Sequence, residues 1–177
     1  MATICICYGT TDGQTAEVAE YVAAGIRELG HVARVVDLKD PADVALDGVD
    51  AVLVGASIHM NSHASYVVNF VKANLTTLRS LPSAFVSVSL SAYGDPARAT
   101  GYIEQFCAQT GWQPNASIAV AGALRYTRYG VVKRGLMKQV AREKNLSTDT
   151  SVDAVYTDWD AVSAFTRDFI SKIAVRT

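Results

Sequence analysis

The run from Tyr8 to Thr15 combines hydroxyl side chains with glycines, between an apolar β-rich segment and a segment with helical periodicity. A phosphate needs hydrogen-bond donors on several sides, which hydroxyls, backbone N–H groups and a helix N-terminus supply together. Gly13 lets the backbone turn tightly, whereas the Asp12 carboxylate would repel an anion and must point away unless the loop differs locally. The candidate ligands are Thr10, Thr11, Asp12, Gly13, Gln14 and Thr15. By itself, the motif fits a polar turn in which Thr15 only caps the helix equally well.

Two further segments follow central strands and carry small, polar and aromatic residues. They comprise Ser57, Ile58, His59 and Met60 after the third strand, and Leu90, Ser91, Ala92, Tyr93 and Gly94 after the fourth. In an open α/β sheet, ligands bind beyond the carboxyl ends of the strands. Backbone amides suit the heteroatoms of a planar ring, Tyr93 offers a stacking face, and His59 could poise a proton or cover the ring edge. Either segment alone is typical of a loop, but three segments converging on one crevice indicate a binding site.

The remaining histidines and the cysteines indicate no metal or redox site. We expect His63 to be a solvated residue at a helix entry and His31 to open an ordinary strand, since nothing here has metal-ligand spacing. Cys5 and Cys7 lie two apart in a strand and therefore point to the same side, and Cys107 lies in a helix. Small buried hydrophobes in a reducing compartment are the favoured interpretation of all three.

The elements that must position these residues alternate along the chain. Apolar β-rich runs predict five strands, at Thr3–Tyr8, Val32–Asp37, Ala51–Ile58, Ala84–Leu90 and Ala116–Leu124. Helical periodicity predicts helices at Thr15–Leu29, Tyr66–Leu78, Ala99–Gln109, Val131–Lys144 and Trp159–Val175, the last with Asp158 as N-cap, and a weak helix or loop containing Pro41. This alternation predicts an α/β fold with a doubly wound five-stranded parallel sheet. If the strand order is 2-1-3-4-5, the crevice for a ligand lies between the first and third strands. A chain of 177 residues without a linker is expected to form one domain, residues 1–177.

One segment before the last helix is strongly basic. Residues 125–144 carry seven Lys and Arg and one Glu, or +6, whereas the rest carries nine basic and 16 acidic residues, or −7. Val132, Leu136, Met137 and Val140 give its helix an apolar stripe. Such a helix could lie on an anionic membrane or receive a polyanionic ligand, or it could pack on the sheet with a solvated basic face. No apolar run approaches the ~20 residues that span a bilayer, and the start lacks signal-peptide features, so a cytoplasmic protein is expected.

The motifs together resemble a known family. Thr10, Gly13 and Thr15 match the FMN-phosphate loop of flavodoxins. Further blocks are Asp-Gly-Gln-Thr at 12–15, Gly-Ala-Ser-Ile at 55–58, Pro-Ser-Ala-Phe at 82–85, Ala-Gly-Ala-Leu-Arg-Tyr at 121–126, Arg-Tyr at 128–129, Thr-Asp-Thr at 148–150 and Val-Tyr-Thr-Asp-Trp at 155–159. In this order, over nearly the whole chain, they resemble the bacterial flavodoxin-like protoporphyrinogen IX dehydrogenase family, whose members depend on menaquinone. The resemblance implies a flavodoxin-like fold with the strand order 2-1-3-4-5, FMN as cofactor, six-electron oxidation of a porphyrinogen, a respiratory quinone as acceptor and peripheral attachment to the cytoplasmic membrane.

The resemblance also implies roles for the candidate residues. The loop at 10–15 is expected to bind the FMN phosphate, and the segments at 57–60 and 90–94 the isoalloxazine. Because the flavin carries the chemistry, no catalytic side chain is expected. No nucleic-acid partner is expected either. We expect Arg125 and Arg128 to face the propionates of the substrate or the membrane, with Tyr126 and Tyr129 as apolar walls.

Three alternatives stay open. An electron-shuttling flavodoxin would usually be acidic around the flavin, which the basic segment disfavours. An NAD(P)H:quinone reductase is a second alternative, although the chain has no G-x-G-x-x-G fingerprint. A non-enzymatic module that has lost FMN is the third, and the intact phosphate loop argues against it.

Overall fold

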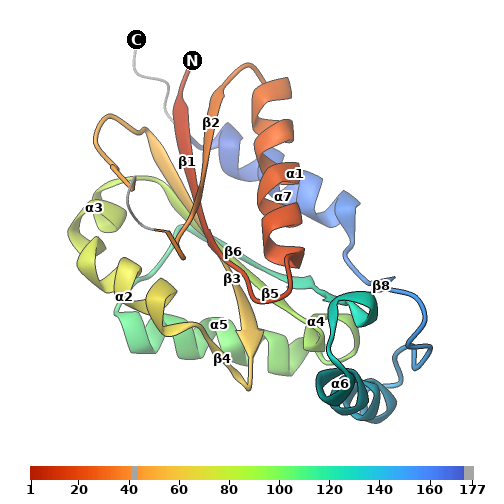
Figure 1. Cartoon of the computed structure of the whole chain (residues 1–177). Coiled ribbons are helices and arrows are strands. Elements are labelled where there is room, and N and C mark those ends of the chain that lie inside the picture. The colour runs from red at the N-terminus through yellow and green to blue at the C-terminus, as the bar shows by residue number, and fades with distance from the viewer. Residues whose placement is uncertain (41–43, 174–177) are drawn as a thin grey trace.

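A parallel sheet forms the centre of the protein (Figure 1). The computed structural model describes residues 1–40 and 44–173. The sheet consists of β1 (Thr3–Gly9), β2 (Val32–Asp37), β3 (Ala51–His59), β5 (Ser83–Ser89) and β6 (Ala116–Ala121). Their order is β2-β1-β3-β5-β6, and each pair of neighbours is parallel. This confirms the predicted α/β fold and the order 2-1-3-4-5 of its five main strands.

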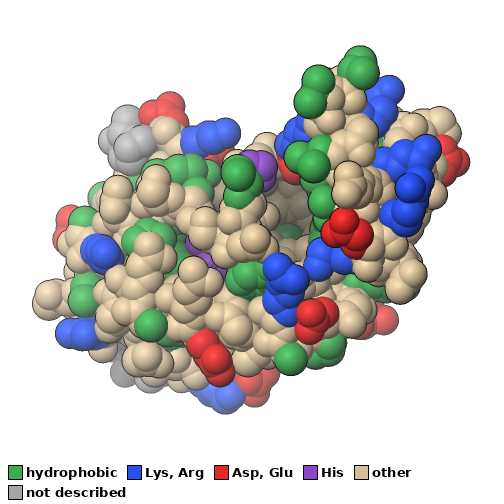
Figure 2. Space-filling view, turned by 90° about the horizontal axis from the view of Figure 1, so that it is seen from below, with side chains coloured by type: hydrophobic (Ala, Val, Ile, Leu, Met, Phe, Trp, Pro, Cys, Tyr) green, Lys and Arg blue, Asp and Glu red, His purple; other side chains and the backbone are tan. Residues whose placement is uncertain are grey.

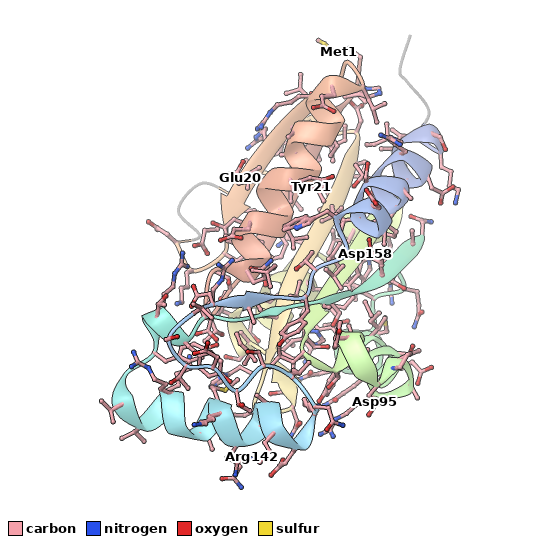
Figure 3. The ribbon with its side chains drawn as sticks, turned by 90° about the vertical axis from the view of Figure 1, so that its right-hand side faces the viewer. Met1, Glu20, Tyr21, Asp95, Arg142 and Asp158 are labelled. Carbon is pink, nitrogen blue, oxygen red and sulfur yellow. The ribbon has the colours of Figure 1, made fainter. Side chains whose placement is uncertain are left out.

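Helices cover both faces of the sheet, which explains why the central strands are apolar on both sides. α1 (Gln14–Glu28) and α7 (Trp159–Ser171) lie side by side on one face, where the Tyr21 ring packs on Trp159 at 4.7 Å between centroids (Figure 3). The opposite face carries α2 (Ser65–Ala73), α3 (Leu75–Ser80) and α5 (Pro96–Thr110). As predicted, Cys5 and Cys7 point to one face and are buried there as free thiols.

Two predicted helices end differently in the structure. The segment 66–78 forms two helices, because the Asn74 side chain donates to the Phe70 carbonyl oxygen and the chain turns between α2 and α3. The last helix begins as predicted, with the Asp158 carboxylate accepting from the Ala161 N–H, but it ends at Ser171. The predicted end at Val175, and Pro41 with its predicted helix or loop, lie outside the described residues.

The fifth strand is shorter than predicted, because the chain leaves the sheet at Gly122. Gly122 still donates to the Ser89 carbonyl oxygen of β5, but its own carbonyl oxygen accepts from the Tyr156 N–H, so the chain turns away from β5 after this residue. β7 (Ala123–Leu124) then pairs antiparallel with β8 (Ala154–Val155). Between them lie a short 3₁₀ turn (Tyr126–Arg128) and α6 (Val131–Glu143). We call residues 122–157 the insertion; it lies at the carboxyl ends of the strands, beside α4 (Ser91–Gly94) (Figure 1).

A hairpin after β3 overturns the expectation for His63. β4 (Ser62–His63) folds back antiparallel onto β3 through Met60 and Asn61, which both have positive φ as in a two-residue type I′ turn. His63 is therefore buried, at 8% exposure, and not solvated as predicted. Its ring lies 5.3 Å from that of Phe85 and 5.0 Å from that of Phe106, and its Nε2 is 2.9 Å from Ser87 Oγ. Burial lowers the pKa of His63 to about 4.

Candidate functional site

A crevice at the carboxyl ends of the strands brings most of the predicted ligands together. It lies between the loop before α1 and the ends of β3, β5 and β6. The predicted residues that line it are Thr10, Thr11, Asp12, Gln14, Thr15, Ser57, Ile58 and Leu90. Residues far apart in sequence meet here because all these strands are parallel and present their carboxyl ends at one edge.

The Thr15 hydroxyl is the group in this crevice that most clearly awaits a ligand. Thr15 is 1% exposed, and its Oγ1 has no hydrogen-bond partner among the described residues. A buried hydroxyl without a partner is costly, and this one stands in the first turn of the 15-residue helix α1. Thr15 does not cap α1, since Gly13 is the N-cap and no side chain makes a capping hydrogen bond. The arrangement fits an anion such as a phosphate, attracted by the free N–H groups of the helix.

The loop itself is preformed for this task. Thr10 Oγ1 accepts from the Gly13 N–H at 2.9 Å, which closes the turn. Gly13 adopts φ 92°, a left-handed conformation that favours glycine. A Cβ at Gly13 would also lie 2.7 Å from the Arg128 guanidinium, so the position has no room for another residue without movement of Arg128.

The Asp12 carboxylate is directed toward cationic and phenolic groups of the insertion. Its Oδ1 pairs with Lys133 Nζ at 2.5 Å, and its Oδ2 lies 3.4 Å from the hydroxyl of Tyr129. Arg128 donates to the Asp12 carbonyl oxygen at 3.3 Å. Burial raises the pKa of Tyr129 to about 12, so this phenol stays protonated and can donate. The insertion therefore neutralises the carboxylate that would otherwise repel an anion.

Arg125 is the second link between the insertion and the loop. Its Nη2 donates to Gln14 Oε1 and pairs with Glu17 Oε2 at 2.6 Å, and its Nη1 lies 3.8 Å from Asp153 Oδ2. Arg125 is largely buried. The charge of Arg125 is thus compensated inside the protein, which does not fit the expectation that it faces a propionate or the membrane.

The two tyrosines of this segment are also structural in the described arrangement. Tyr126 is completely buried, and its hydroxyl donates to the Ser147 carbonyl oxygen at 2.8 Å. Tyr129 is buried beside it, with 5.9 Å between the ring centroids. Their burial leaves no surface for a substrate wall. Of the four predicted contact residues, Arg128 alone is exposed.

Several residues of the predicted ring-binding segments lie outside the crevice. Tyr93 packs against Tyr156 at 4.7 Å and lines, with Ala92, a different hollow on the α7 side of the sheet. Ser91 and Gly94 line a larger hollow that adjoins the crevice. His59 ends β3, and Met60 stands exposed at the tip of the hairpin. Stacking by Tyr93 would therefore require it to leave Tyr156.

Sequence reasoning missed four residues of the crevice: Val88, Ser89, Gly122 and Ala123. Val88 and Ser89 fall inside the predicted strand Ala84–Leu90. Gly122 falls inside the predicted strand Ala116–Leu124, which is longer than the strand in the structure. The rule that ligands bind at carboxyl strand ends, applied to a glycine at the end of a β-rich run, could have found Gly122.

Comparisons with known proteins agree with this geometry. A family profile described as a flavodoxin domain matches residues 5–151. The chain is 37% identical over 166 residues to an Escherichia coli (strain K12) protein named protoporphyrinogen IX dehydrogenase [quinone], covering 92% of each chain. A Leishmania major protein of the same name is 36% identical, over 92% of this chain and 72% of its own. The crystal structure of oxidised flavodoxin 1 from Bacillus cereus has the same fold, with a TM-score of 0.61 and 16% identity over 98% of this chain and all of the other.

Proposed function

Because the chain belongs to the flavodoxin-domain family and, within it, to the protoporphyrinogen IX dehydrogenase (quinone) family, we propose that it oxidises protoporphyrinogen IX to protoporphyrin IX with FMN as cofactor and a quinone as acceptor. Six electrons and six protons leave the porphyrinogen in this reaction, and three quinones, each taking up two of both, become quinols. The structural observation that carries the cofactor assignment is the buried, unpartnered Thr15 hydroxyl at the start of α1.

In this proposal, different residues of the crevice bind the phosphate and the ring system of FMN. The loop at 10–15 holds the phosphate through the Thr15 hydroxyl and the N–H groups of the first turn of α1. Ser57, Ile58 and Leu90 contact the flavin, with His59 and Met60 beside it on the hairpin and Ser91 and Gly94 on the adjoining segment. When bound, FMN supplies the chemistry, since a flavin can take electrons from a reduced substrate and pass them to a quinone. The role of the chain is to hold, orient and shield it.

An anaerobic assay tests this function. The purified protein is expected to show flavin absorbance and to form fluorescent porphyrin from protoporphyrinogen IX only when a menaquinone analogue is present. A Thr15→Val variant, which keeps the shape but removes the hydroxyl, should lose FMN affinity. Flavin absorbance without quinone-dependent porphyrin formation would contradict the enzymatic function and favour an electron shuttle.

We further propose that α6 holds the protein at the cytoplasmic face of an anionic membrane, where the quinone dissolves. Val131 and Val132 are 87% and 88% exposed at the start of α6, and Leu136 follows on the same exposed side. Lys138 and Arg142 are exposed further along, with Arg142 directed away from the body (Figure 3). An apolar row next to basic residues suits the boundary between headgroups and acyl chains. No helix in the described part of the chain is long and apolar enough to cross a membrane.

Vesicle flotation tests the membrane contact. The protein should float with vesicles that contain phosphatidylglycerol and remain unbound with pure phosphatidylcholine. A Val132→Ser/Leu136→Ser variant should lose this binding, whereas Leu29→Ser, which changes an exposed leucine next to α1, should keep it. Equal flotation of the two variants would contradict the role of α6.

A further inference from the structure

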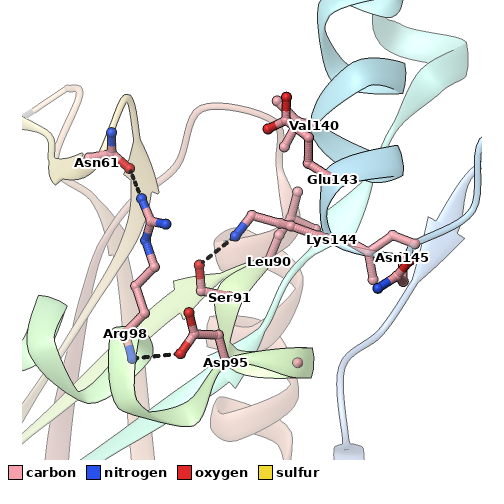
Figure 4. A pocket seen from close by; sticks show the side chains of 11 residues that line it. Asn61, Leu90, Ser91, Asp95, Arg98, Val140, Glu143, Lys144 and Asn145 are labelled. Atoms are coloured by element: carbon pink, nitrogen blue, oxygen red, sulfur yellow. Dashed lines mark hydrogen bonds between the residues drawn. The ribbon is translucent and has the colours of Figure 1, made fainter.

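A hollow of about 580 Å³ adjoins the cofactor crevice, between α6 on one side and α4 and α5 on the other (Figure 4). Leu90 lines both the hollow and the crevice, so the two spaces lie next to each other. Figure 2 shows the depression between the body and the projecting basic segment. The volume lies in the range of about 300–1,000 Å³ that is usual for small-molecule sites. We call it the cation hollow, for the two residues described next.

Arg98 of α5 and Lys144 at the end of α6 reach into the cation hollow from opposite sides (Figure 4). Arg98 donates to Asn61 Oδ1 at 2.9 Å and to the Tyr102 hydroxyl at 3.0 Å. Lys144 donates to Ser91 Oγ at 3.0 Å. All these partners are neutral, and within residues 1–40 and 44–173 neither cation forms a salt bridge.

The two acids that line the hollow are engaged by their own helices. Asp95 caps α5, with its carboxylate accepting from the Arg98 N–H at 3.0 Å. Glu143 accepts from Gln139 one turn earlier on α6, at 3.4 Å. Neither acid forms a salt bridge with Arg98 or Lys144 in the described part of the chain. Both cations therefore keep capacity for an anionic ligand.

Two basic residues near the phosphate loop, unlike Arg98 and Lys144, form salt bridges among the described residues. Arg125 is paired with Glu17, and Lys133 with Asp12. A carboxylate ligand would have to break those ion pairs, whereas at Arg98 and Lys144 it would replace neutral acceptors. A carboxylate is an ionised acceptor that can form an ion pair with either cation, so these two residues are the more accessible partners for an anionic ligand.

We propose that the cation hollow binds the two propionate carboxylates of the porphyrinogen, one at Arg98 and one at Lys144. The proposal rests on the proposed function and specifies how its substrate is held. Leu90, Val140 and Leu146 line the same hollow and provide apolar contact for the macrocycle. Because the hollow and the crevice share Leu90 as a lining residue, a macrocycle held by its propionates lies near the cofactor. Two cations on different helices orient the substrate as well as bind it.

A double variant, Arg98→Gln/Lys144→Gln, tests this role. Its matched control is Lys72→Gln/Arg167→Gln, which removes the same charge from exposed positions on α2 and α7. The binding probes are protoporphyrin IX and its dimethyl ester in nonionic detergent, followed by fluorescence on the FMN-loaded protein. Wild type and control should bind the diacid at least about tenfold more tightly than the diester, and the double variant should bind both alike. The KM for protoporphyrinogen should rise about tenfold or more in the double variant, with the KM for quinone and the Kd for FMN unchanged.

The other outcomes distinguish failure of the subsite from failure of the proposed function. Unchanged diacid affinity in the double variant would show that the propionates bind elsewhere. A parallel loss of diester binding would indicate a shape defect, and a weaker Kd for FMN would assign the cations to the cofactor. A wild-type protein that discriminates diacid from diester yet forms no porphyrin would refute the enzymatic function while supporting the subsite. Turnover that the double variant leaves intact would refute the subsite alone.

Discussion

The sheet body of the protein and its insertion at residues 122–157 differ in how much apolar surface each buries. Both faces of the sheet pack on extensive apolar clusters, with Phe85, Phe106 and Trp112 completely buried on one of them. The insertion has a small cluster around Tyr126 and Leu124, and α6 contributes one fully buried residue, Ala141. Apolar burial is the dominant favourable term in folding, so the two regions must be held in place differently.

Polar contacts fasten the insertion to the body, and they converge on the cofactor loop. Arg125 binds Gln14 and Glu17, Lys133 binds Asp12, and Gln14 itself donates to the Thr157 hydroxyl at 2.9 Å. The residues of the body that anchor the insertion are therefore close in sequence to Thr15. We expect order in the insertion and affinity for the cofactor to be linked, and the stability of the body to depend mainly on its own apolar clusters.

The largest effect should come from the core of the body. Phe85 stacks on Phe106 at 4.3 Å and 11°, and a Phe85→Ala variant should lose about 3–5 kcal/mol of unfolding free energy through lost burial and the remaining cavity. In the insertion, Met137→Ala removes a half-buried side chain and should cost about 1 kcal/mol. Urea unfolding of both variants measures the difference. Equal losses would show that the insertion has a core comparable with that of the body.

Acid should destabilise the body through His63. In the unfolded chain this histidine has a pKa of about 6.5, and burial lowers its pKa to about 4 in the folded protein. Its contribution is therefore complete above pH 6.5 and is lost as the pH falls toward 4, by about 3 kcal/mol in total. Unfolding free energies of wild type and His63→Gln should converge over this range. Parallel slopes for wild type and His63→Gln would contradict the role of His63.

The hydrophobic pattern made the body predictable from sequence. Apolar runs and helical periodicity reflect burial directly, so the parallel sheet and the loop at the end of β1 could be derived from the chain alone, whereas the strand order followed from the resemblance to flavodoxins. The burial of His63 was not predicted because it depends on a turn at Met60 and Asn61. This turn lacks the Asn-Gly or Gly-Gly sequence typical of such hairpins. The turn places His63 against Phe85 and Phe106, a contact that no local pattern encodes.

The insertion was less predictable because charge does not reveal its partner. The basic run at 125–144 was evident from the sequence. However, Arg125 binds Gln14 and Glu17, which lie more than a hundred residues away from it in the chain. The same pattern gave no means to distinguish paired cations from free ones. Arg125 was expected to face a propionate or the membrane and is buried. Arg98, which forms no salt bridge in the described part of the chain, is the single basic residue of the segment 91–102.

Removal of Arg125 should separate the insertion from the body. In Arg125→Gln, Glu17 loses its ion-pair partner but is partly solvated. The lost charge-assisted hydrogen bonds should lower the stability of the attachment by about 1.5–3 kcal/mol. Hydrogen exchange should become faster in α6 but not in β1 or β3, and the Kd for FMN should rise about tenfold. Arg27→Gln, at the other end of α1, is the control. Equal acceleration across the sheet would show that Arg125 stabilises the body as a whole.

The smallest effect concerns Lys133 and Asp12, and it tests the link between insertion and cofactor most directly. The pair is partly exposed, so its contribution to stability should be about 0–1 kcal/mol and weaker at high salt. Its effect on FMN has another cause: in Lys133→Gln the Asp12 carboxylate lies uncompensated beside the phosphate site and should weaken FMN binding severalfold. In Asp12→Asn/Lys133→Gln the repulsion disappears, so FMN affinity should recover. Fluorescence titration of FMN into the four proteins of this double-mutant cycle measures the coupling, and additive losses would show that Lys133 acts on the cofactor without Asp12.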